Sequence, residues 1–259
     1  MEKILWMIID MQNDFCSPSG ALYVPGAEKD AERVAWLMEA WQSRIAAVLL
    51  TRDEHQVMDI AHPVFWKNPE GYAPPVFTRI TAAEVRQGRW RPRREKVLVL
   101  DYLQQLEARG GGLTIWPEHC IVGSEGAAIF PVVMEAVQKW CRTGKYVNML
   151  TKGTYPLAEH YGAFQAEVPR PEVPETQLNL FWLQKLKAYD RIWVAGEARS
   201  HCVARTLGQL LDFPDIVRKL VILSDCMSPV AGDEEKTCRL FGLLTDRGAT
   251  LTTAAGLVA

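Results

Sequence analysis

The sequence has little of what marks several large classes of protein. Its 259 residues carry a formal net charge of only −2, which gives no reason to expect nucleic acid or a membrane surface as a partner. The six cysteines form no CxxC pair, which argues against a zinc ribbon or a thioredoxin-like motif and fits a reducing cytoplasm. The apolar run Ile4–Ile9 is too short for a signal peptide or a membrane span, and no other uncharged run approaches spanning length. We therefore expect a cytoplasmic globular protein, and 48% apolar residues are ample for its core.

Short apolar runs alternate with helical patterns along the chain. Six strands are expected, at Ile4–Ile9, Ile45–Thr51, Tyr146–Thr151, Ile192–Ala195, Leu220–Ser224 and Thr250–Thr253. Helices are expected at Glu28–Glu39, Ala127–Lys139, Gln177–Lys187 and Asp233–Thr245. Continuous apolar strands are typical of a parallel sheet covered by helices on both faces. The pattern predicts one doubly wound, three-layer α/β/α domain over residues 1–259, with a mostly parallel six-stranded sheet.

Residues 63–113 fit this alternation poorly. They contain a loop rich in Pro, Gly and aromatic residues, a run of five arginines, and an expected helix over Lys96–Arg109. Thr81 and Glu84 have the spacing of a capping box, which predicts a second, short helix. The arginines fit a solvated face better than an anion-binding site. We expect an excursion inserted into one domain and not a second domain.

Cys202 lies where an apolar strand ended by Gly196 gives way to a helical pattern. A thiol in the first turn of a helix feels the positive end of the helix dipole, which favours the nucleophilic thiolate. Asp10 and Lys152 also follow apolar strands, and the active site of a doubly wound domain lies at the carboxyl ends of its strands. The three would then act together, with Asp10 as base, Lys152 stabilising the thiolate and Cys202 attacking. Taken singly, each has a structural alternative: an inert buried thiol, a turn cap and a surface lysine.

Histidine is scarce, with five residues in the chain, and three of them are candidate metal ligands. Asp53 and His55 are two apart after an expected strand, so they share one face of extended chain. His119, in Trp-Pro-Glu-His-Cys, is the candidate third ligand, and His62 could be a fourth. Two histidines and a carboxylate suit a divalent metal with open positions. Solvated or core histidines are nevertheless commoner than ligands.

Together these motifs resemble the nicotinamidase branch of the isochorismatase-like cysteine hydrolases, from Ile8 to about Ser228. Asp10 in IDMQNDF, Lys152 in KGTY and Cys202 in SHCV match the base, lysine and nucleophile of that family. Asp53, His55 and His119 match its metal ligands. The resemblance implies an amidohydrolase of NAD salvage that converts nicotinamide to nicotinate and ammonia through a thioester on Cys202. It also implies one divalent ion, zinc first and iron or manganese next, and a homo-oligomer.

The resemblance also implies how the substrate is held. Phe15, Trp116 and His201 would enclose the pyridine ring, and the backbone N–H groups of Ala198 and Cys202 would form the oxyanion hole, beside a cis peptide at Glu197–Ala198. The long excursion and the charged residues Glu197 and Arg199 depart from the family pattern. They leave open another small amide or carbamoyl substrate, whose acid group the arginine-rich excursion would recognise. A non-catalytic α/β binding protein is a third hypothesis.

Overall fold

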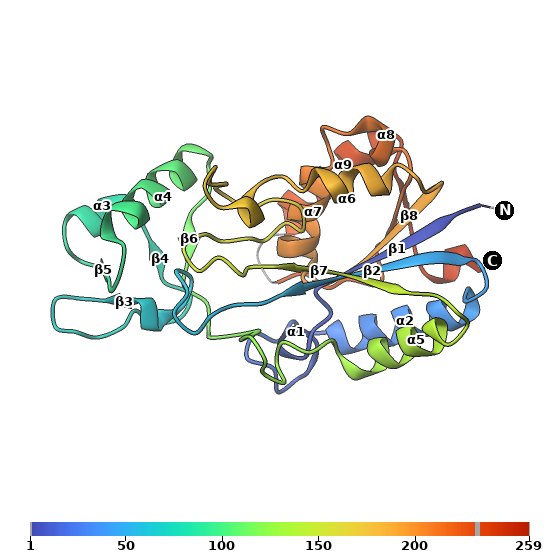
Figure 1. The fold of residues 1–259 in the computed structure, drawn as a ribbon, viewed down its shortest axis with the longest axis horizontal. Coiled ribbons are helices and arrows are strands. Elements are labelled where there is room, and N and C mark those ends of the chain that lie inside the picture. The colour runs from blue at the N-terminus through green and yellow to red at the C-terminus, as the bar shows by residue number, and fades with distance from the viewer. Residues whose placement is uncertain (1, 231–233, 259) are drawn as a thin grey trace.

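The computed structural model describes residues 2–230 and 234–258, and a six-stranded sheet forms its centre (Figure 1). All pairings in this sheet are parallel, in the order β10-β9-β8-β1-β2-β7. The six predicted strands are therefore confirmed, and the sheet is fully and not just mostly parallel. The strands are β1 (Ile4–Ile9), β2 (Ile45–Asp53), β7 (Val147–Lys152), β8 (Arg191–Gly196), β9 (Leu220–Leu223) and β10 (Thr250–Thr252).

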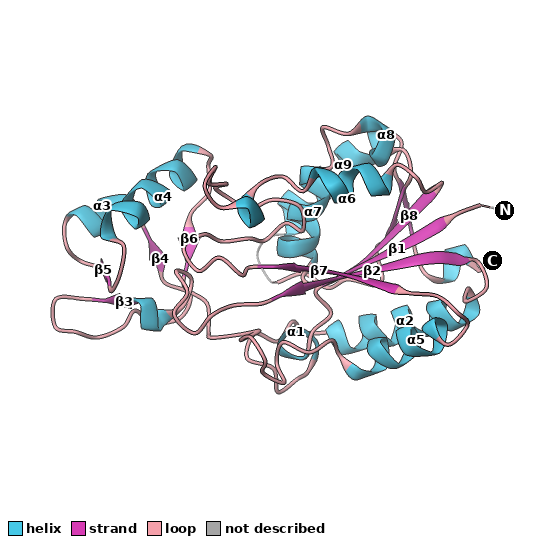
Figure 2. Cartoon of the chain, viewed as in Figure 1, coloured by secondary structure: helices cyan, strands magenta, loops and turns pink. Residues whose placement is uncertain are grey.

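Helices cover both faces of the sheet, which confirms the three-layer prediction (Figure 2). Alternate residues of β1 enter opposite cores, with Trp6 in one and Met7 in the other. The first core is closed by α2 (Ala27–Ala40) and α5 (Pro131–Cys141), and the short α1 (Asn13–Cys16) packs at its edge. The second is closed by α6 (Leu180–Leu186), α7 (Ala204–Gln209), α8 (Pro214–Val217) and α9 (Glu234–Asp246).

Two helices start several residues after the predicted position, and one predicted start cannot be compared. Helix α5 begins at Pro131, four residues late, because a proline at the first helical position starts a helix readily. Helix α6 begins at Leu180, where the Asn179 side chain accepts a hydrogen bond from the Trp182 N–H. Asp233, the predicted start of the last helix, lies outside the described residues.

The excursion lies beyond the carboxyl ends of the central strands (Figure 1). Thr81 forms the predicted capping box with Glu84 at the start of α3, and the predicted helix from Lys96 is present as α4. A third hydrophobic cluster lies under these helices and includes Ala158, Ala166 and Val168 from the chain after β7. The helices and strands of the excursion are β3 (Trp66–Lys67), β4 (Arg79–Ile80), α3 (Ala82–Arg86), β5 (Arg91–Pro92), α4 (Lys96–Ala108) and β6 (Leu113–Thr114).

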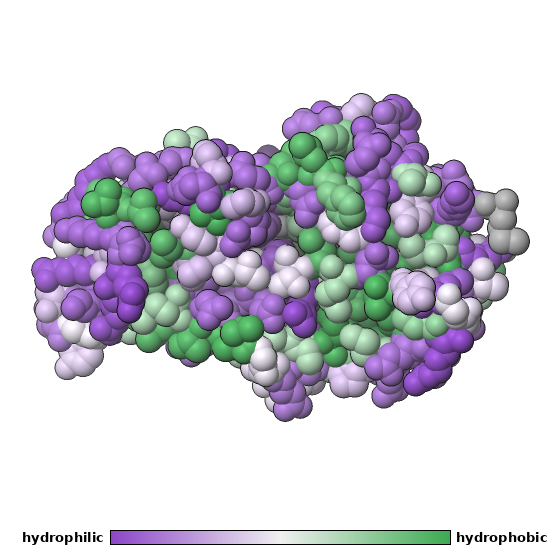
Figure 3. All heavy atoms as spheres, in the orientation of Figure 1, coloured by the Kyte–Doolittle hydropathy of each residue, from purple (hydrophilic) through white to green (hydrophobic). Residues whose placement is uncertain are grey.

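The outer end of the excursion is strongly hydrophilic in the view of Figure 3. All five arginines between Arg86 and Arg94 are exposed, as a solvated face requires. Within residues 2–230 and 234–258, no helix is long and apolar enough to cross a membrane.

Candidate active site

Polar side chains at the carboxyl ends of three neighbouring strands lie close together. Asp10 follows β1, Asp53 ends β2 and Lys152 ends β7, and the last two are register partners. Asp10 has a positive φ of 44°, an uncommon conformation for a residue other than glycine. The Thr51 hydroxyl holds it, accepting from its N–H at 3.0 Å and donating to its Oδ1 at 2.5 Å. The predicted convergence of these residues is present.

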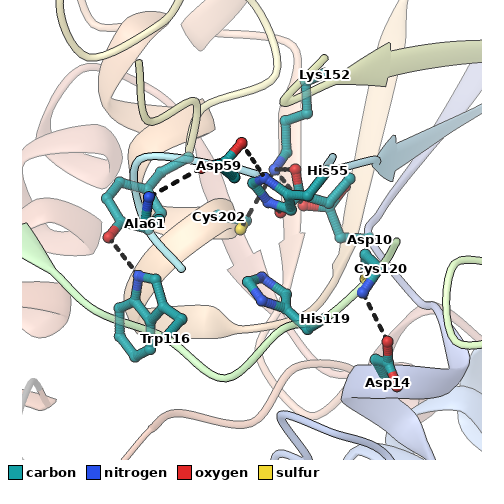
Figure 4. Close-up of polar contacts among 12 residues, drawn as sticks. Asp10, Asp14, His55, Asp59, Ala61, Trp116, His119, Cys120, Lys152 and Cys202 are labelled. Carbon is teal, nitrogen blue, oxygen red and sulfur yellow. Dashed lines mark hydrogen bonds and ion pairs between the residues drawn. The ribbon is translucent and has the colours of Figure 1, made fainter. Parts of the chain in front are cut away.

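Lys152 is the centre of this cluster and is only 1% exposed. Its Nζ lies 2.9 Å from Asp10 Oδ2, 3.1 Å from Asp53 Oδ1 and 3.7 Å from Cys202 Sγ (Figure 4). Gly153 follows with φ of +79°, and a side chain there would run into the Asp53 carboxylate. Burial opposes the charge on Lys152, but Asp10 and Asp53 outweigh it and hold its pKa well above the ordinary value. The lysine is a buried cation shared by two carboxylates.

The pKa values of the two carboxyl groups, Asp10 and Asp53, are shifted in opposite directions. Burial raises the pKa of Asp10, although Lys152 works against that rise. For Asp53 the same burial is outweighed by Lys152 and His55, so its pKa falls below the ordinary value. A group whose pKa is raised toward neutrality can take and return a proton, whereas one whose pKa is lowered stays an anion. The surroundings of the two carboxyl groups thus differ: those of Asp10 favour proton uptake, whereas those of Asp53 favour the anion.

Cys202 is buried in a π-helical turn, Arg199–Val203, and the α-helix α7 begins two residues later. Burial raises the pKa of its thiol well above the ordinary value; Lys152 lowers it, and a hydrogen bond with Asp10 raises it further. The expectation of a thiolate made by a helix dipole is therefore wrong for this state, because burial dominates. The thiol proton is held against Asp10, which is placed to remove it.

The turn before Cys202 is held by backbone contacts. At Gly196, φ is 136° and a Cβ would collide with the backbone oxygen of Ile9, so only glycine fits. The Glu197–Ala198 peptide bond is cis, as the resemblance implies. The Glu197 N–H donates to Ile9 O at 2.8 Å. Ala198 and Cys202 both line the cavity in front of the sulfur.

Asp53, His55 and His119 form the predicted metal group. One possible ligand atom from each lies within 4.8 Å of the others, and all three residues are buried. The imidazole centroids of His55 and His119 are 4.8 Å apart, and that of His62 lies 5.3 and 5.5 Å from them. The His62 Nε2 is buried without a hydrogen-bond partner.

The second nitrogen of each imidazole supports this assignment. Nδ1 of His55 lies 3.2 Å from Asp59 Oδ2, that of His119 lies 2.8 Å from Pro117 O, and that of His62 lies 3.3 Å from Val57 O. Metal-ligating histidines commonly donate their second nitrogen to such an oxygen, which turns the other nitrogen to the ion. Burial, reinforced by neighbouring His55, lowers the pKa of His119 to about 3, which keeps it neutral, as a ligand must be. These residues fit a divalent cation.

A cavity of about 400 Å³ joins the metal group to the nucleophile. Phe15, Trp116 and His201 line it as predicted, and the Trp116 ring lies 5.5 Å from His201, edge to face. In Figure 4 the Cys202 sulfur has Lys152 on one side and His119 and Trp116 on the other. None of the excursion's five arginines is among its lining residues in the described part of the chain. Recognition of an acid group by those arginines therefore has no support here.

Several residues of this cavity carried no assigned role in the sequence. Among them, Glu159, His160 and Tyr161 follow β7, and Phe77 comes from the excursion. Tyr161 accepts a hydrogen bond from Trp116 Nε1 at 2.9 Å, and burial raises the pKa of Glu159 to about 8. The position of Glu159–Tyr161 after a strand end was an available signal, whereas Phe77 lies outside any regular pattern.

Comparison with known proteins agrees with the site. No family model matches, but the nicotinamidase of Escherichia coli is 27% identical over 249 residues, 96% of this chain and 94% of its own. That of Saccharomyces cerevisiae is 26% identical over 229 residues, 88% of this chain and 89% of its own. Over most of its length this chain is therefore similar to nicotinamidases, as its motifs indicate.

Solved structures of nicotinamidases and pyrazinamidases share the fold. A nicotinamidase–pyrazinamidase from Acinetobacter baumanii superposes with a TM-score of 0.65 at 20% identity, covering 99% of each chain. A pyrazinamidase of Pyrococcus horikoshii in complex with zinc gives 0.57 at 19% identity, over 97% of this chain and 99% of the other.

Proposed function

We propose that this protein is a metal-dependent cysteine amidohydrolase that converts nicotinamide to nicotinate and ammonia. The observation that carries the proposal is the Lys152 ammonium, which contacts both Asp10 and the Cys202 sulfur. The aromatic cavity over the sulfur supports a flat ring amide, and both curated relatives are nicotinamidases.

The reaction proceeds by acyl transfer to sulfur. Asp10 takes the Cys202 proton while Lys152 stabilises the thiolate, and the sulfur attacks the amide carbonyl carbon. The N–H groups of Ala198 and Cys202 stabilise the resulting oxyanion. Asp10 returns the proton to nitrogen as the C–N bond breaks, and ammonia leaves. Water, deprotonated by Asp10, then breaks the thioester and releases the acid and the free thiol.

Asp53, His55 and His119 would hold the divalent ion, with His62 beside them. When bound, the ion supplies a Lewis acid next to the ring-binding part of the cavity. We propose zinc, because Zn²⁺ favours two histidines and a carboxylate and a zinc complex is known for a structural neighbour; iron and manganese share that preference.

Ammonia release from nicotinamide tests the proposal, with Cys202→Ala as the inactive control. Mass spectrometry of protein quenched during turnover should show Cys202 carrying a nicotinoyl group, and Cys202→Ala should show none. Wild-type protein loaded with metal that releases no ammonia at saturating nicotinamide would refute the proposal. A panel of other small amides and carbamoyl compounds tests the alternative substrate.

We also propose that residues 1–259 form one domain into which 63–113 is inserted. The cluster under the excursion includes residues from the chain after β7, so the excursion does not form its core alone. Cytoplasmic location, a role in NAD salvage and homo-oligomerisation stay predictions.

A further inference from the structure

A buried pair of carboxyl groups lies directly behind the nucleophile turn. Glu197 precedes Ala198 in that turn and is fully buried, and Asp30 on α2 is 4% exposed. The two side chains hydrogen-bond to each other. Neither takes part in the acyl transfer described above.

Ser228 connects both carboxyl groups to the turn. Its N–H donates to both carboxyl oxygens of Glu197, at 3.3 and 3.2 Å, and its hydroxyl donates to Asp30 Oδ2 at 2.5 Å. Its carbonyl accepts from the Arg199 N–H at 2.9 Å, on the far side of Ala198 from Glu197. The network therefore holds both residues that flank Ala198.

The same network reaches a second segment that lines the substrate cavity. Pro229 and Val230 follow Ser228 directly and line the cavity, as Ala198 does. The Val230 N–H donates to Ser200 Oγ at 2.9 Å, within the nucleophile turn. The position of the turn relative to this segment therefore depends on the bonds made by the carboxyl pair.

The pair must retain one proton, because two buried carboxyl groups in contact do not both ionise readily. Burial raises the pKa of Glu197 well above its ordinary value, and Asp30 adds to the rise. Burial also raises the pKa of Asp30, but hydrogen bonds from Ser228 and Glu197 work against that rise, which favours the proton on Glu197. The other charged or titratable groups facing the pair are Arg33, Arg199, Asp225, Cys16 and Cys226.

The two arginines do not replace the proton. Arg33 reaches Asp30 at 2.9 Å, but its side chain is 44% exposed, so solvent screens the pair. Arg199 lowers the pKa of Glu197, but burial and Asp30 outweigh it. The buried thiols of Cys16 and Cys226 supply no positive charge, and Asp225 adds a negative one. Loss of the Glu197 proton would therefore place two poorly compensated anions side by side behind Ala198.

We propose that Glu197 is a positioning residue: as a neutral acid bonded to Asp30 and Ser228, it holds the Ala198 N–H where the oxyanion forms. This inference rests on the proposed function, in which Ala198 contributes to the oxyanion hole. Deprotonation removes the hydrogen bond that Glu197 donates to Asp30 and sets two anions against each other behind the turn, which lowers the rate of the chemical step while binding of the ring is retained.

Three variants test the proposal by their pH profiles for nicotinamide hydrolysis with metal bound. Glu197→Gln keeps the shape and the bonds but has no proton to lose, so its kcat should stay within about threefold of wild type at neutral pH and persist further into alkaline pH. Glu197→Leu removes the bonds, and its kcat should fall about 10- to 100-fold across the pH range, with much less change in KM. Glu32→Gln, an exposed carboxyl on the same helix as Asp30, should match wild type.

Two results would overturn the proposal. One is a Glu197→Gln profile that superimposes on the wild-type profile, and the other is wild-type kcat in Glu197→Leu. Thermal unfolding of every variant shows whether a lost rate reflects a lost fold. A kcat loss in Glu197→Leu that disappears once its unfolded fraction is accounted for also counts against a positioning role.

A measurement without substrate separates this inference from the proposed function. The infrared difference spectrum of wild type minus Glu197→Gln should contain the C=O stretch of a protonated buried carboxyl, and that of wild type minus Glu32→Gln should not; Glu159 contributes equally to all three proteins and cancels. If wild type hydrolyses no nicotinamide, the proposed function fails; if the first difference spectrum lacks that band, this inference fails.

Discussion

Replacement of Lys152 by methionine tests the centre of the site, because it removes the shared cation and keeps most of the side-chain volume. The ammonium lies 2.9 Å from one carboxylate and 3.1 Å from the other. At these distances and an effective dielectric constant of about 20, each attraction is about 5–6 kcal/mol. Desolvation of the buried ammonium offsets several kcal/mol of this sum.

The net effect follows from what the substitution leaves behind. Removal of one partner from a buried ion pair typically destabilises a protein by about 3–5 kcal/mol, because the remaining charge is uncompensated. For a chain of this size, that loss corresponds to a fall in Tm of about 6–20 °C. Lys152→Met should also lose nearly all amidase activity, because the thiolate loses its cation.

The double variant Asp10→Asn/Lys152→Met distinguishes charge from packing. It removes one uncompensated anion together with the cation, so it should recover at least half of the lost free energy of unfolding while staying inactive. Urea unfolding of metal-free protein measures the first quantity and ammonia release the second. Lys152→Met within about 1 kcal/mol of wild type, or with more than a tenth of its kcat, would refute the charge argument.

Three further predictions concern the metal, the buried acid and the cavity. Zn²⁺ at about 100 times its Kd should stabilise metal-free protein by about 2.7 kcal/mol, and Asp53→Asn should remove most of this gain, as calorimetry with and without a chelator will show. The folded-state pKa of Glu197 lies above its unfolded value, so its contribution to stability is complete below the unfolded pKa and is lost as pH rises through the folded pKa. Urea unfolding at a series of pH values should therefore show a loss of stability toward alkaline pH in wild type and in Glu32→Gln. In Glu197→Gln that loss should be smaller. Phe77 is 61% exposed and lies edge to face against the Trp116 ring in the cavity wall. Phe77→Ala should therefore raise KM about 2- to 10-fold and leave kcat unchanged. Tyr72→Ala, in the same excursion but outside the cavity, should change neither.

The strands could be predicted because their residues are buried on both faces. Every residue of β1 is buried, so its apolar run had no competing interpretation, and its predicted bounds are those observed. Helix starts were less certain, because a single cap or proline decides them. Ala127 continues the apolar pattern of α5 but lies outside it, since the helix starts at Pro131.

The candidate site could be predicted where it depends on strand ends, because a parallel sheet brings those ends together whatever the loops do. Asp10, Asp53 and Lys152 are of this kind. Phe77 reaches the cavity through the folding of the excursion, and Asp30 meets Glu197 through the packing of α2, so neither has a periodicity to detect. The acidity of Cys202 was misjudged because a local rule about helix ends contains no term for burial.

The molecule buries two pairs of carboxyl groups near one nucleophile and compensates them differently. Asp10 and Asp53 share the fully buried ammonium of Lys152, so both can be anions, and their unequal surroundings raise the pKa of Asp10 and lower that of Asp53. Asp30 and Glu197 face the partly exposed Arg33 and Arg199, whose effect burial outweighs, so a proton compensates this pair. A cation leaves the first pair free to exchange a proton with the thiol, whereas the second pair keeps its hydrogen bonds only while it keeps its proton. A glutamate therefore fits before Ala198 because Asp30 lies opposite to accept its hydrogen bond.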